Sequence, residues 1–382
     1  MNLPAASKRL TYIVNHLSAD DAQHFAHIPR LLSEMEALGW EIDLLSERGG
    51  DGNAEVLGRR VTYLSRASKL RRMVRLAVCL FAMRTRGGHL VFVRISKFAA
   101  LTSALLGRIF GWKTVYWLSG TVEDFNRRSG ARGKVGLAGM RLLLKFVDRL
   151  ATGPETMVGY YSAQYGLSKQ KILMLYNDID IPQSAPGRDP AAIASKVLLV
   201  HRLSPVREAD RYFIPLLQAL GRHSGNINTP VTLDICGDGP DRRRLEFLAE
   251  GAPKGVVVRF HGAVPQRKLA PFYEAADMFV MPSYREGFPR VMLEAMAHSL
   301  PIVATDAGGT RDLCGPAQRQ YVVDRHDANA FGRAVERLLS SRPERRELAG
   351  ENMVTVQRYS TAKVARMYDE ALAGLIGEPA AT

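Results

Sequence analysis

The sequence predicts an α/β protein of two domains, each a parallel sheet with helices on its faces. Three observations support this class. With 382 residues, the chain is too long for one ordinary core and suits two domains of similar size. Residues 278–314 alternate strand, loop, helix and strand, which is the βαβ pattern of parallel sheets. Residues 10–45 show the same alternation near the start of the chain.

The first half is expected to alternate strands and helices. Short apolar runs predict strands at residues 10–15, 40–45, 88–94 and 113–118. Helical patterns predict helices at residues 22–38, 67–86, 98–110 and 140–150, the last after a basic, glycine-rich loop. Pro29 indicates a kink or a late start of the first helix, because proline removes an N–H and crowds the preceding turn.

The helix predicted for residues 67–86 has an apolar middle and basic ends. Its apolar residues at helical spacing are Leu70, Met73, Val74, Ala77, Leu80 and Phe81. One interpretation is a core helix with solvated ends. The other is a face resting on anionic lipid head groups, where each basic residue near the surface contributes about 1 kcal/mol.

Charge is unevenly distributed along the chain. The net formal charge is +14, and residues 1–185 carry +11 of it, with 26 Lys and Arg against 15 Asp and Glu. Residues 57–121 contain thirteen Lys and Arg and no acidic residue. Such a basic half suits nucleic acid, an anionic membrane surface or a phosphorylated substrate. No nucleic-acid motif accompanies the charge, so we expect no nucleic-acid partner.

Cysteine content and hydropathy indicate the compartment in which the protein is expected. Cys79, Cys236 and Cys314 show neither disulfide nor metal-ligand spacing, which is typical of a reducing compartment. We see no secretory leader and no apolar stretch of about eighteen residues. The expectation is a cytoplasmic protein without a membrane-spanning segment.

The second half is expected to form another strand-helix alternation. Predicted strands lie at residues 197–200, 232–236, 256–261, 278–281 and 301–305, and predicted helices at 289–298, 328–340 and 361–376. The proline-containing segment 182–190 is the predicted linker. We therefore expect one domain at residues 1–185, a second at 186–360, and a C-terminal helix with a tail at 361–382.

The loop and helix after strand 278–281 form the main candidate ligand site. In a βαβ unit, helix N-termini gather at the carboxyl ends of the strands, where free N–H groups and the helix dipole favour an anion. Glu286 in this loop can accept hydrogen bonds from hydroxyl groups, and the backbone of Gly287, Phe288 and Pro289 faces a phosphate. Glu294 follows on the second helical turn. Taken singly, the two carboxylates also fit a capping acid and a solvated helix residue.

The stretch Glu286-Gly-Phe-Pro-Arg-Val-Met-Leu-Glu294 resembles the Glu-x7-Glu signature of retaining glycosyltransferase family 4. The similarity continues through residues 301–309, with their paired glycines Gly308 and Gly309. It implies the GT-B fold, in which two Rossmann-like domains with parallel sheets face each other across a cleft. The first domain would bind the acceptor and the second a nucleotide sugar. Glu286 is implied to hold hydroxyls of the donor sugar, and Glu294 the ribose.

Other segments extend the resemblance. His201-Arg-Leu-Ser-Pro-Val-Arg207 is similar to the family's Gly-Arg-Leu-x-Pro-x-Lys-Gly, whose two cations bind the donor diphosphate. Arg202 and Arg207 are therefore implied as diphosphate ligands, while His201 and Glu208 replace the glycines. Val264 is implied to lie in the stretch against the nucleobase. The family also implies that helix 361–376 packs back on the first domain.

Two departures lie in the first half. Family members usually carry Gly-Gly after the first strand, where this chain has residues 17–21 without glycine. They often carry His-Gly after the strand at 113–118, where this chain has Ser119-Gly120. A serine can donate a hydrogen bond but cannot act as an imidazole. Ser119, Gly120, His24 and His27 are the candidates for the acceptor side of the cleft.

The resemblance implies a hexosyltransferase-like reaction with retention, no metal and no cofactor beyond the nucleotide-sugar substrate. Asp178-Ile-Asp180 spells the Asp-x-Asp metal site of the other main glycosyltransferase fold, but its position before the linker argues against a metal. The implied acceptor is a lipid-linked oligosaccharide of bacterial exopolysaccharide, capsule or lipopolysaccharide synthesis. The protein would then be peripheral at the inner face of the plasma membrane. A soluble small-molecule acceptor and a donor-binding protein without turnover remain as alternatives.

Overall fold

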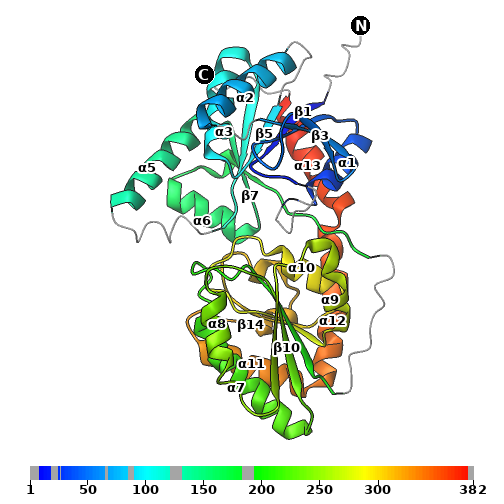
Figure 1. The fold of residues 1–382 in the computed structure, drawn as a ribbon. Helices are drawn as coiled ribbons and strands as arrows, with labels where there is room; N and C mark the ends of the chain where they lie inside the picture. The colour runs from blue at the N-terminus through cyan, green and yellow to red at the C-terminus, as the bar shows by residue number, and fades with distance from the viewer. Residues whose placement is uncertain are drawn as a thin grey trace. The chain divides into compact units, whose positions relative to one another are not determined.

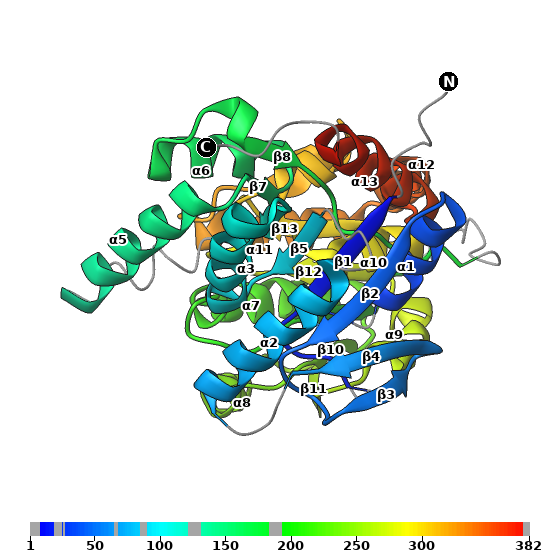
Figure 2. The same ribbon diagram turned by 90° about the horizontal axis from the view of Figure 1, so that it is seen from above.

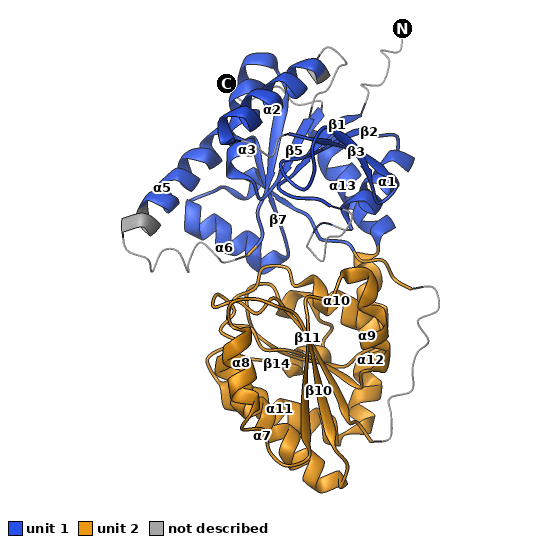
Figure 3. Cartoon of the chain, viewed as in Figure 1, with its two compact units in different colours: residues 1–119, 123–178, 361–382 blue, residues 120–122, 179–360 orange. Residues whose placement is uncertain are grey.

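A computed structural model describes residues 8–18, 25, 27–64, 68–84, 90–120, 131–182 and 193–376. The chain forms two compact units (Figure 3). Unit 1 comprises residues 1–119, 123–178 and 361–382, and unit 2 comprises residues 120–122 and 179–360. Each unit contains one sheet of mainly parallel strands with helices on both faces, so the predicted α/β class is confirmed.

Unit 1 is built on an eight-stranded sheet in the order β3-β4-β2-β1-β5-β6-β7-β8. All neighbours are parallel except the hairpin of β3 and β4. Its strands are β1 (Arg9–Val14), β2 (Glu41–Ser46), β3 (Asn53–Val56), β4 (Arg59–Tyr63), β5 (Leu90–Arg94), β6 (Lys113–Trp117), β7 (Arg149–Thr152) and β8 (Ile172–Met174). The central strands are buried on both faces, as the continuous apolar runs predict.

Helices cover both faces of this sheet (Figure 2). One face packs against α2 (Lys69–Arg84), α3 (Lys97–Phe110), α5 (Ala131–Phe146) and α6 (Glu155–Tyr165). The other carries α1 (Ile28–Ala37) and α13 (Thr361–Ile376), which contact each other. Pro29 lies in the first turn of α1, so the late start that it indicates is confirmed. The loop expected before residue 140 is wrong from residue 131 onward, where α5 is already helical.

Of the apolar residues predicted at helical spacing in the helix at 67–86, only some face the core. Leu80 is buried, but the core-facing residue one turn before it is Leu76. Leu70, Val74 and Phe81 point outward, with 69%, 58% and 49% of their surfaces exposed. The helix has apolar residues on more than one side, so spacing alone did not decide which side the sheet would cover.

Unit 2 is built on a six-stranded parallel sheet in the order β11-β10-β9-β12-β13-β14. Its strands are β9 (Lys196–Val200), β10 (Val231–Cys236), β11 (Val256–Gly262), β12 (Met278–Met281), β13 (Ile302–Thr305) and β14 (Val322–Val323). Its helices are α7 (Asp210–Ile227), α8 (Arg242–Ala249), α9 (Ala270–Ala275), α10 (Arg290–Ala297), α11 (Ala328–Ser340) and α12 (Arg342–Val356) (Figure 1).

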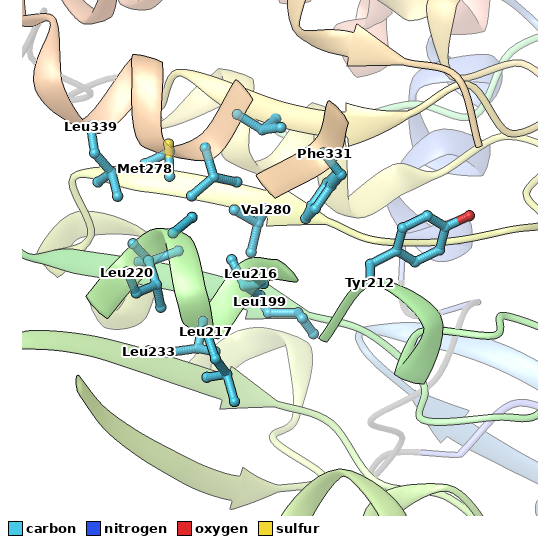
Figure 4. Close-up of a cluster of buried hydrophobic side chains, with 14 of the residues drawn as sticks. Leu199, Tyr212, Leu216, Leu217, Leu220, Leu233, Met278, Val280, Phe331 and Leu339 are labelled. Carbon is cyan, nitrogen blue, oxygen red and sulfur yellow. The ribbon is translucent and has the colours of Figure 1, made fainter. Parts of the chain in front are cut away.

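The core of unit 2 lies between its sheet and the helices α7 and α11 (Figure 4). Leu199 and Val280, from the neighbouring strands β9 and β12, are fully buried in it. Leu216 of α7 and Phe331 of α11 close the same cluster. Anchoring both strands in one core fixes the position of the loops that follow them.

In the described parts of the chain, no helix combines the length and apolar character needed to cross a bilayer.

Candidate active site

The candidate site of unit 2 lies at the carboxyl ends of β9 and β12, which are neighbours in the sheet. The chain winds from β9 toward β10 on one side and from β12 toward β13 on the other. Open α/β sheets bind ligands at such a switch point, because the loops diverge there and leave a crevice. Three loops belong to this edge: residues 201–209 after β9, 282–289 after β12 and 306–310 after β13.

Glu286 is the buried carboxylate of this edge, with 6% of its surface exposed. Its Oε1 atom contacts Arg207 Nη1 and lies 3.2 Å from His201 Nε2. No hydrogen bond to the other oxygen, Oε2, is found among the described residues. One carboxylate oxygen is thus held by the protein, while the other can accept a hydrogen bond from a ligand.

Hydrogen bonds join the three loops around Glu286. The Tyr284 N–H donates to the Arg207 carbonyl at 2.7 Å, which links the loop after β12 to the loop after β9. Arg207 Nη1 donates to the Arg285 carbonyl at 3.1 Å. The Ser283 N–H donates to Thr305 Oγ1 at 3.0 Å, which reaches the end of β13. These bonds give the site a fixed framework.

Gly308 and Gly309 bring the loop after β13 against the backbone of the Glu286 loop. Gly308 has φ +59°, and a Cβ atom added there would lie 2.0 Å from the Glu286 carbonyl oxygen. The Gly309 N–H donates to the Gly287 carbonyl at 3.1 Å. Only glycine satisfies both the left-handed conformation and the close approach. The structure therefore brings both paired glycines to Glu286.

Two cations accompany Glu286. Arg207 is three-quarters buried, and burial together with the charge of Arg202 lowers its pKa to about 10, so it stays protonated at neutral pH. Arg202 is exposed, and no ion pair involving it is found among the described residues. The site therefore holds more positive than negative charge, which favours an anionic ligand.

Glu208 occupies a position where the resembling family has glycine, and its backbone explains that preference. Its φ of +50° is in the left-handed region, which costs a non-glycine residue about 1 kcal/mol. The side chain offsets this cost through Arg285 Nη1 at 2.7 Å and Arg211 Nη2 at 3.0 Å. The glycine-like turn is thus kept without the glycine.

The helix α10 begins directly behind the Glu286 loop. Pro289 is its N-cap residue and offers no side-chain acceptor to the first turn. Phe288 packs edge-on against Tyr359, with ring centroids 5.8 Å apart. Gly287, Phe288 and Pro289 therefore lie where the sequence places a helix N-terminus, and binding of a phosphate there remains a prediction.

Glu294 lies on α10 and has both carboxylate oxygens bonded within the protein. Gln266 Nε2 donates to Oε1 and the Tyr273 hydroxyl donates to Oε2, each at 2.9 Å. Burial and the Glu294 charge raise the pKa of Tyr273 well above its usual value, so this hydroxyl keeps its proton. Val264 lies in the loop that leads to Gln266. Binding of a ribose by Glu294 remains a prediction.

The candidates from the first half of the chain lie in separate surroundings. His27 is buried, with Nε2 3.7 Å from Asp178 Oδ1 and 3.5 Å from Arg94 Nη1. Ser119 is half-buried just beyond β6, and Gly120 has a φ of +103°. His24 lies outside the described residues.

Arg94, which no motif in the sequence marks, is the centre of a buried polar cluster at the end of β5. Its guanidinium donates to Tyr12 Oη at 3.2 Å and to Asn177 Oδ1, and lies 4.4 Å from the ring centroid of Trp117. Thr361 donates to Asp178 at 3.0 Å in the same cluster. The available signal was an arginine ending the apolar run Leu90–Val93. Asp178 of the Asp-x-Asp sequence is thus engaged by side chains of unit 1.

Comparison with known sequences bears on unit 2. Residues 194–353 match the family model described as Glycosyl transferases group 1. D-inositol 3-phosphate glycosyltransferase 2 of Catenulispora acidiphila is 28% identical over 230 residues, which cover 57% of this chain and 54% of that protein. TuaC of Bacillus subtilis, a glycosyltransferase named for teichuronic acid biosynthesis, is 36% identical over 121 residues, covering 32% of this chain and 29% of TuaC. The chain spans about half the length of the curated relatives it matches, and less of TuaC.

Solved structures share the fold over nearly the whole chain. Sucrose-phosphate synthase from Thermosynechococcus elongatus superposes with a TM-score of 0.75 at 19% identity, covering 95% of this chain and all of that one. HepE of Anabaena, solved in complex with UDP and glucose, superposes with a TM-score of 0.70 at 16% identity and the same coverage. The chain therefore has the GT-B fold, and its second unit carries a glycosyltransferase group 1 domain.

Proposed function

We propose that the protein is a retaining, metal-independent glycosyltransferase of family 4, which moves a sugar from a nucleotide-sugar donor to a saccharide acceptor. The observation that carries the proposal is Glu286 at the switch point of unit 2. One of its oxygens is held by Arg207 and His201, and the other is left for a ligand. An acceptor oxygen beside two arginines and a helix N-terminus suits a molecule that has both hydroxyl groups and phosphates. A nucleotide sugar has both, and HepE was solved with UDP and glucose.

In this proposal Arg202, Arg207 and the start of α10 stabilise the charge of the departing diphosphate. Glu286 orients the sugar through a hydroxyl group. The bond between the anomeric carbon and the diphosphate oxygen breaks, and a bond to the acceptor oxygen forms on the same face. The acceptor proton passes to the departing phosphate oxygen, so no protein base is required. Glu294 and Val264 complete the donor site on the ribose and the base.

We further propose that unit 1 rests on an anionic membrane and takes a lipid-linked acceptor. The helices α2, α3 and α5 form one layer and contain eleven Lys and Arg but no Asp or Glu. Their outer surface also exposes large apolar side chains, among them Val78 at 62%, Ile109 at 71% and Leu142 at 55%. Basic and apolar groups together suit lipid head groups better than nucleic acid, which needs no aliphatic contact. One of the relatives, TuaC, is named for teichuronic acid biosynthesis, which also favours a saccharide acceptor.

A soluble phosphorylated acceptor is the second candidate. It is favoured by the relatives named for D-inositol 3-phosphate, and the basic surface of unit 1 also suits a phosphate. A competition experiment distinguishes the two candidate acceptors, because it measures whether vesicles displace soluble acceptors from the protein.

The proposed function is tested by measuring binding and hydrolysis of UDP-, GDP- and ADP-sugars with EDTA present. We expect saturable binding of one donor. Glu286→Gln should weaken it about tenfold to a hundredfold, because a hydrogen bond to a charged group contributes about 1.5–3 kcal/mol. Glu347→Gln, an exposed position on α12, is the matched control and should bind like the wild type.

Absence of binding for every donor, both with EDTA and with magnesium, from a folded protein would refute the nucleotide-sugar proposal. Binding that vanishes with EDTA and returns with magnesium would refute the metal-independent mechanism but not the proposed glycosyltransferase activity.

A further inference from the structure

His201 is the first residue after β9 and lies directly at the switch point. Its side chain is buried, with 6% of the residue exposed, and Nε2 is 3.2 Å from Glu286 Oε1. The similar motif of the resembling family has glycine at this position, so the imidazole is a feature of this chain. It adds a polar ring beside a carboxylate that already has Arg207.

The geometry decides which ring nitrogen carries the hydrogen. An ionised carboxylate only accepts hydrogen bonds, so the nitrogen facing Glu286 Oε1 has to donate. Burial and the neighbouring Arg207 charge lower the pKa of His201 well below its usual value of 6.5, so the ring is neutral at neutral pH. A neutral imidazole with its hydrogen on Nε2 has a lone pair on Nδ1.

That lone pair has no partner among the residues that the structure describes. The Nδ1 atom is buried, and no hydrogen bond to it is found within the described residues. A buried acceptor without a donor destabilises the fold, and native structures seldom leave one unsatisfied without a reason. The same edge holds a second unused acceptor, Glu286 Oε2.

The chemistry of a bound ligand follows from these two acceptors. Phosphate oxygens are themselves acceptors at neutral pH and cannot satisfy Nδ1, whereas a sugar hydroxyl or an amide N–H can. In the proposed donor site the arginines would bind the phosphates, which leaves the two acceptors for the sugar.

We propose that His201 is a positioning and recognition residue for the donor sugar. Its Nε2–H fixes Glu286, and its Nδ1 accepts a hydrogen bond from a hydroxyl or amide N–H of the sugar. This inference rests on the proposed nucleotide-sugar site and adds to it a residue that recognises the sugar.

Two substitutions test the roles of the two ring nitrogens of His201 separately. His201→Gln keeps a donor near the position of Nε2 and removes the acceptor at Nδ1. His201→Asn keeps a polar group near Nδ1 and removes the bond to Glu286. The probe is the nucleotide sugar that the donor panel identifies. The same nucleoside diphosphate without the sugar is the reference ligand. His261→Gln, on the exposed end of β11, is the control variant.

We expect His201→Gln to weaken binding of the nucleotide sugar about tenfold and to leave the nucleoside diphosphate within about twofold, since a single hydrogen bond is lost on the sugar. Deoxy analogues sharpen the test. The analogue lacking the contacted hydroxyl should bind the wild type and His201→Gln equally, while the other deoxy donors should keep the tenfold difference. His201→Asn should lower kcat as well, because Glu286 loses its support.

Equal losses for nucleotide and nucleotide sugar would mean a purely structural role and would overturn the inference, as would wild-type binding by His201→Gln. The tautomer is checked without any ligand by ¹⁵N spectra of the histidine rings, assigned with His201→Gln. A charged ring, or a hydrogen on Nδ1, would overturn the inference even if donors bind. If no donor binds the wild type, the proposed function fails, and the recognition role fails with it.

Discussion

At the residue scale, the site depends on what surrounds Glu286 rather than on the carboxylate alone. Arg207 and His201 both contact Oε1 of Glu286, and Gly308 lets the loop after β13 approach the backbone of Glu286. His201 and Arg207 come from the loop after β9 and Gly308 comes from the loop after β13, so none of them is close to Glu286 in sequence. The contribution of each can be tested separately.

The first prediction concerns acid stability. In the folded chain the pKa of His201 is depressed well below its usual value of 6.5. Between the pKa of the folded chain and 6.5, the unfolded chain therefore binds a proton that the folded chain does not. Stability therefore rises with pH in this window and is lost on acidification, by at most about 1.4 kcal/mol per pH unit. Urea unfolding of wild type and His201→Gln between about pH 5 and about pH 7, followed by circular dichroism, should show a steeper loss for the wild type. Parallel curves would contradict the depressed pKa.

The second prediction concerns Gly308. Gly308→Ala places a Cβ atom 2.0 Å from the Glu286 carbonyl oxygen and forces alanine to φ +59°. We expect a loss of at least about 2 kcal/mol of stability, or a displaced loop with donor binding lost. Gly374→Ala in α13, where the added Cβ meets nothing, is the control and should be neutral or stabilising by up to about 1 kcal/mol. Equal effects of the two substitutions would contradict the proposed close approach.

At the element scale, α13 joins the end of the chain to the sheet of unit 1. Lys8 pairs with Asp369 at 2.7 Å, and Tyr368 stacks near Phe92 and Trp117, with ring centroids 5.6 Å and 6.4 Å away. The sheet residues on this face lie in strands β5 and β6, far from α13 in sequence. The helix is therefore part of the core of unit 1 although it follows unit 2 in the chain.

The third prediction follows from this contact. Tyr368→Ala removes a fully buried ring and should destabilise unit 1 by about 3–5 kcal/mol, as large-to-small core substitutions do. Trp40, Trp112 and Trp117 all lie in unit 1, so tryptophan fluorescence reports its unfolding alone. Tyr368→Phe should cost much less, and exposed Arg366→Ala on the same helix should cost almost nothing. Unchanged fluorescence transitions for Tyr368→Ala would contradict a core role for α13.

At the scale of the whole molecule, charge and apolar exposure concentrate on one layer of unit 1. Residues 186–382 carry only +3 of the net charge of +14. The helices α2, α3 and α5 hold no acidic residue, and their outer surface is unusually apolar. An asymmetric distribution of this kind favours a surface of opposite charge as partner.

The fourth prediction tests that surface. Wild type should sediment with vesicles containing anionic lipid at low salt, and high salt should release it in part, because screening weakens the charge contribution but not the apolar one. Leu70→Ser, Val74→Ser and Val78→Ser together should reduce binding at both salt concentrations. The matched control is Phe247→Ser with Val354→Ser, exposed at 70% and 76% in unit 2, which should bind normally. Binding that persists in the triple variant would refute the proposed face and favour the soluble acceptor.

Sequence patterns alone predict the α/β class, most strand and helix positions, and the segments 201–209, 282–294 and 301–309 of the candidate site. These depend on local patterns: apolar runs for buried parallel strands, prolines and glycines at helix starts and turns, and motifs read along a single loop. Motif resemblance also pointed to Glu286, Arg202 and Arg207, whose catalytic roles remain predictions.

Which face of α2 is buried depends on tertiary packing, because apolar residues lie on more than one side of the helix and the sheet covers one of these sides. Tertiary packing also brings His201 and Arg207 to one oxygen of Glu286, since strands about 80 residues apart in sequence become neighbours only in the sheet. The buried cluster of Arg94 with Asn177 arose in the same way. Contacts between distant loops depend on strand order, which local sequence patterns do not specify.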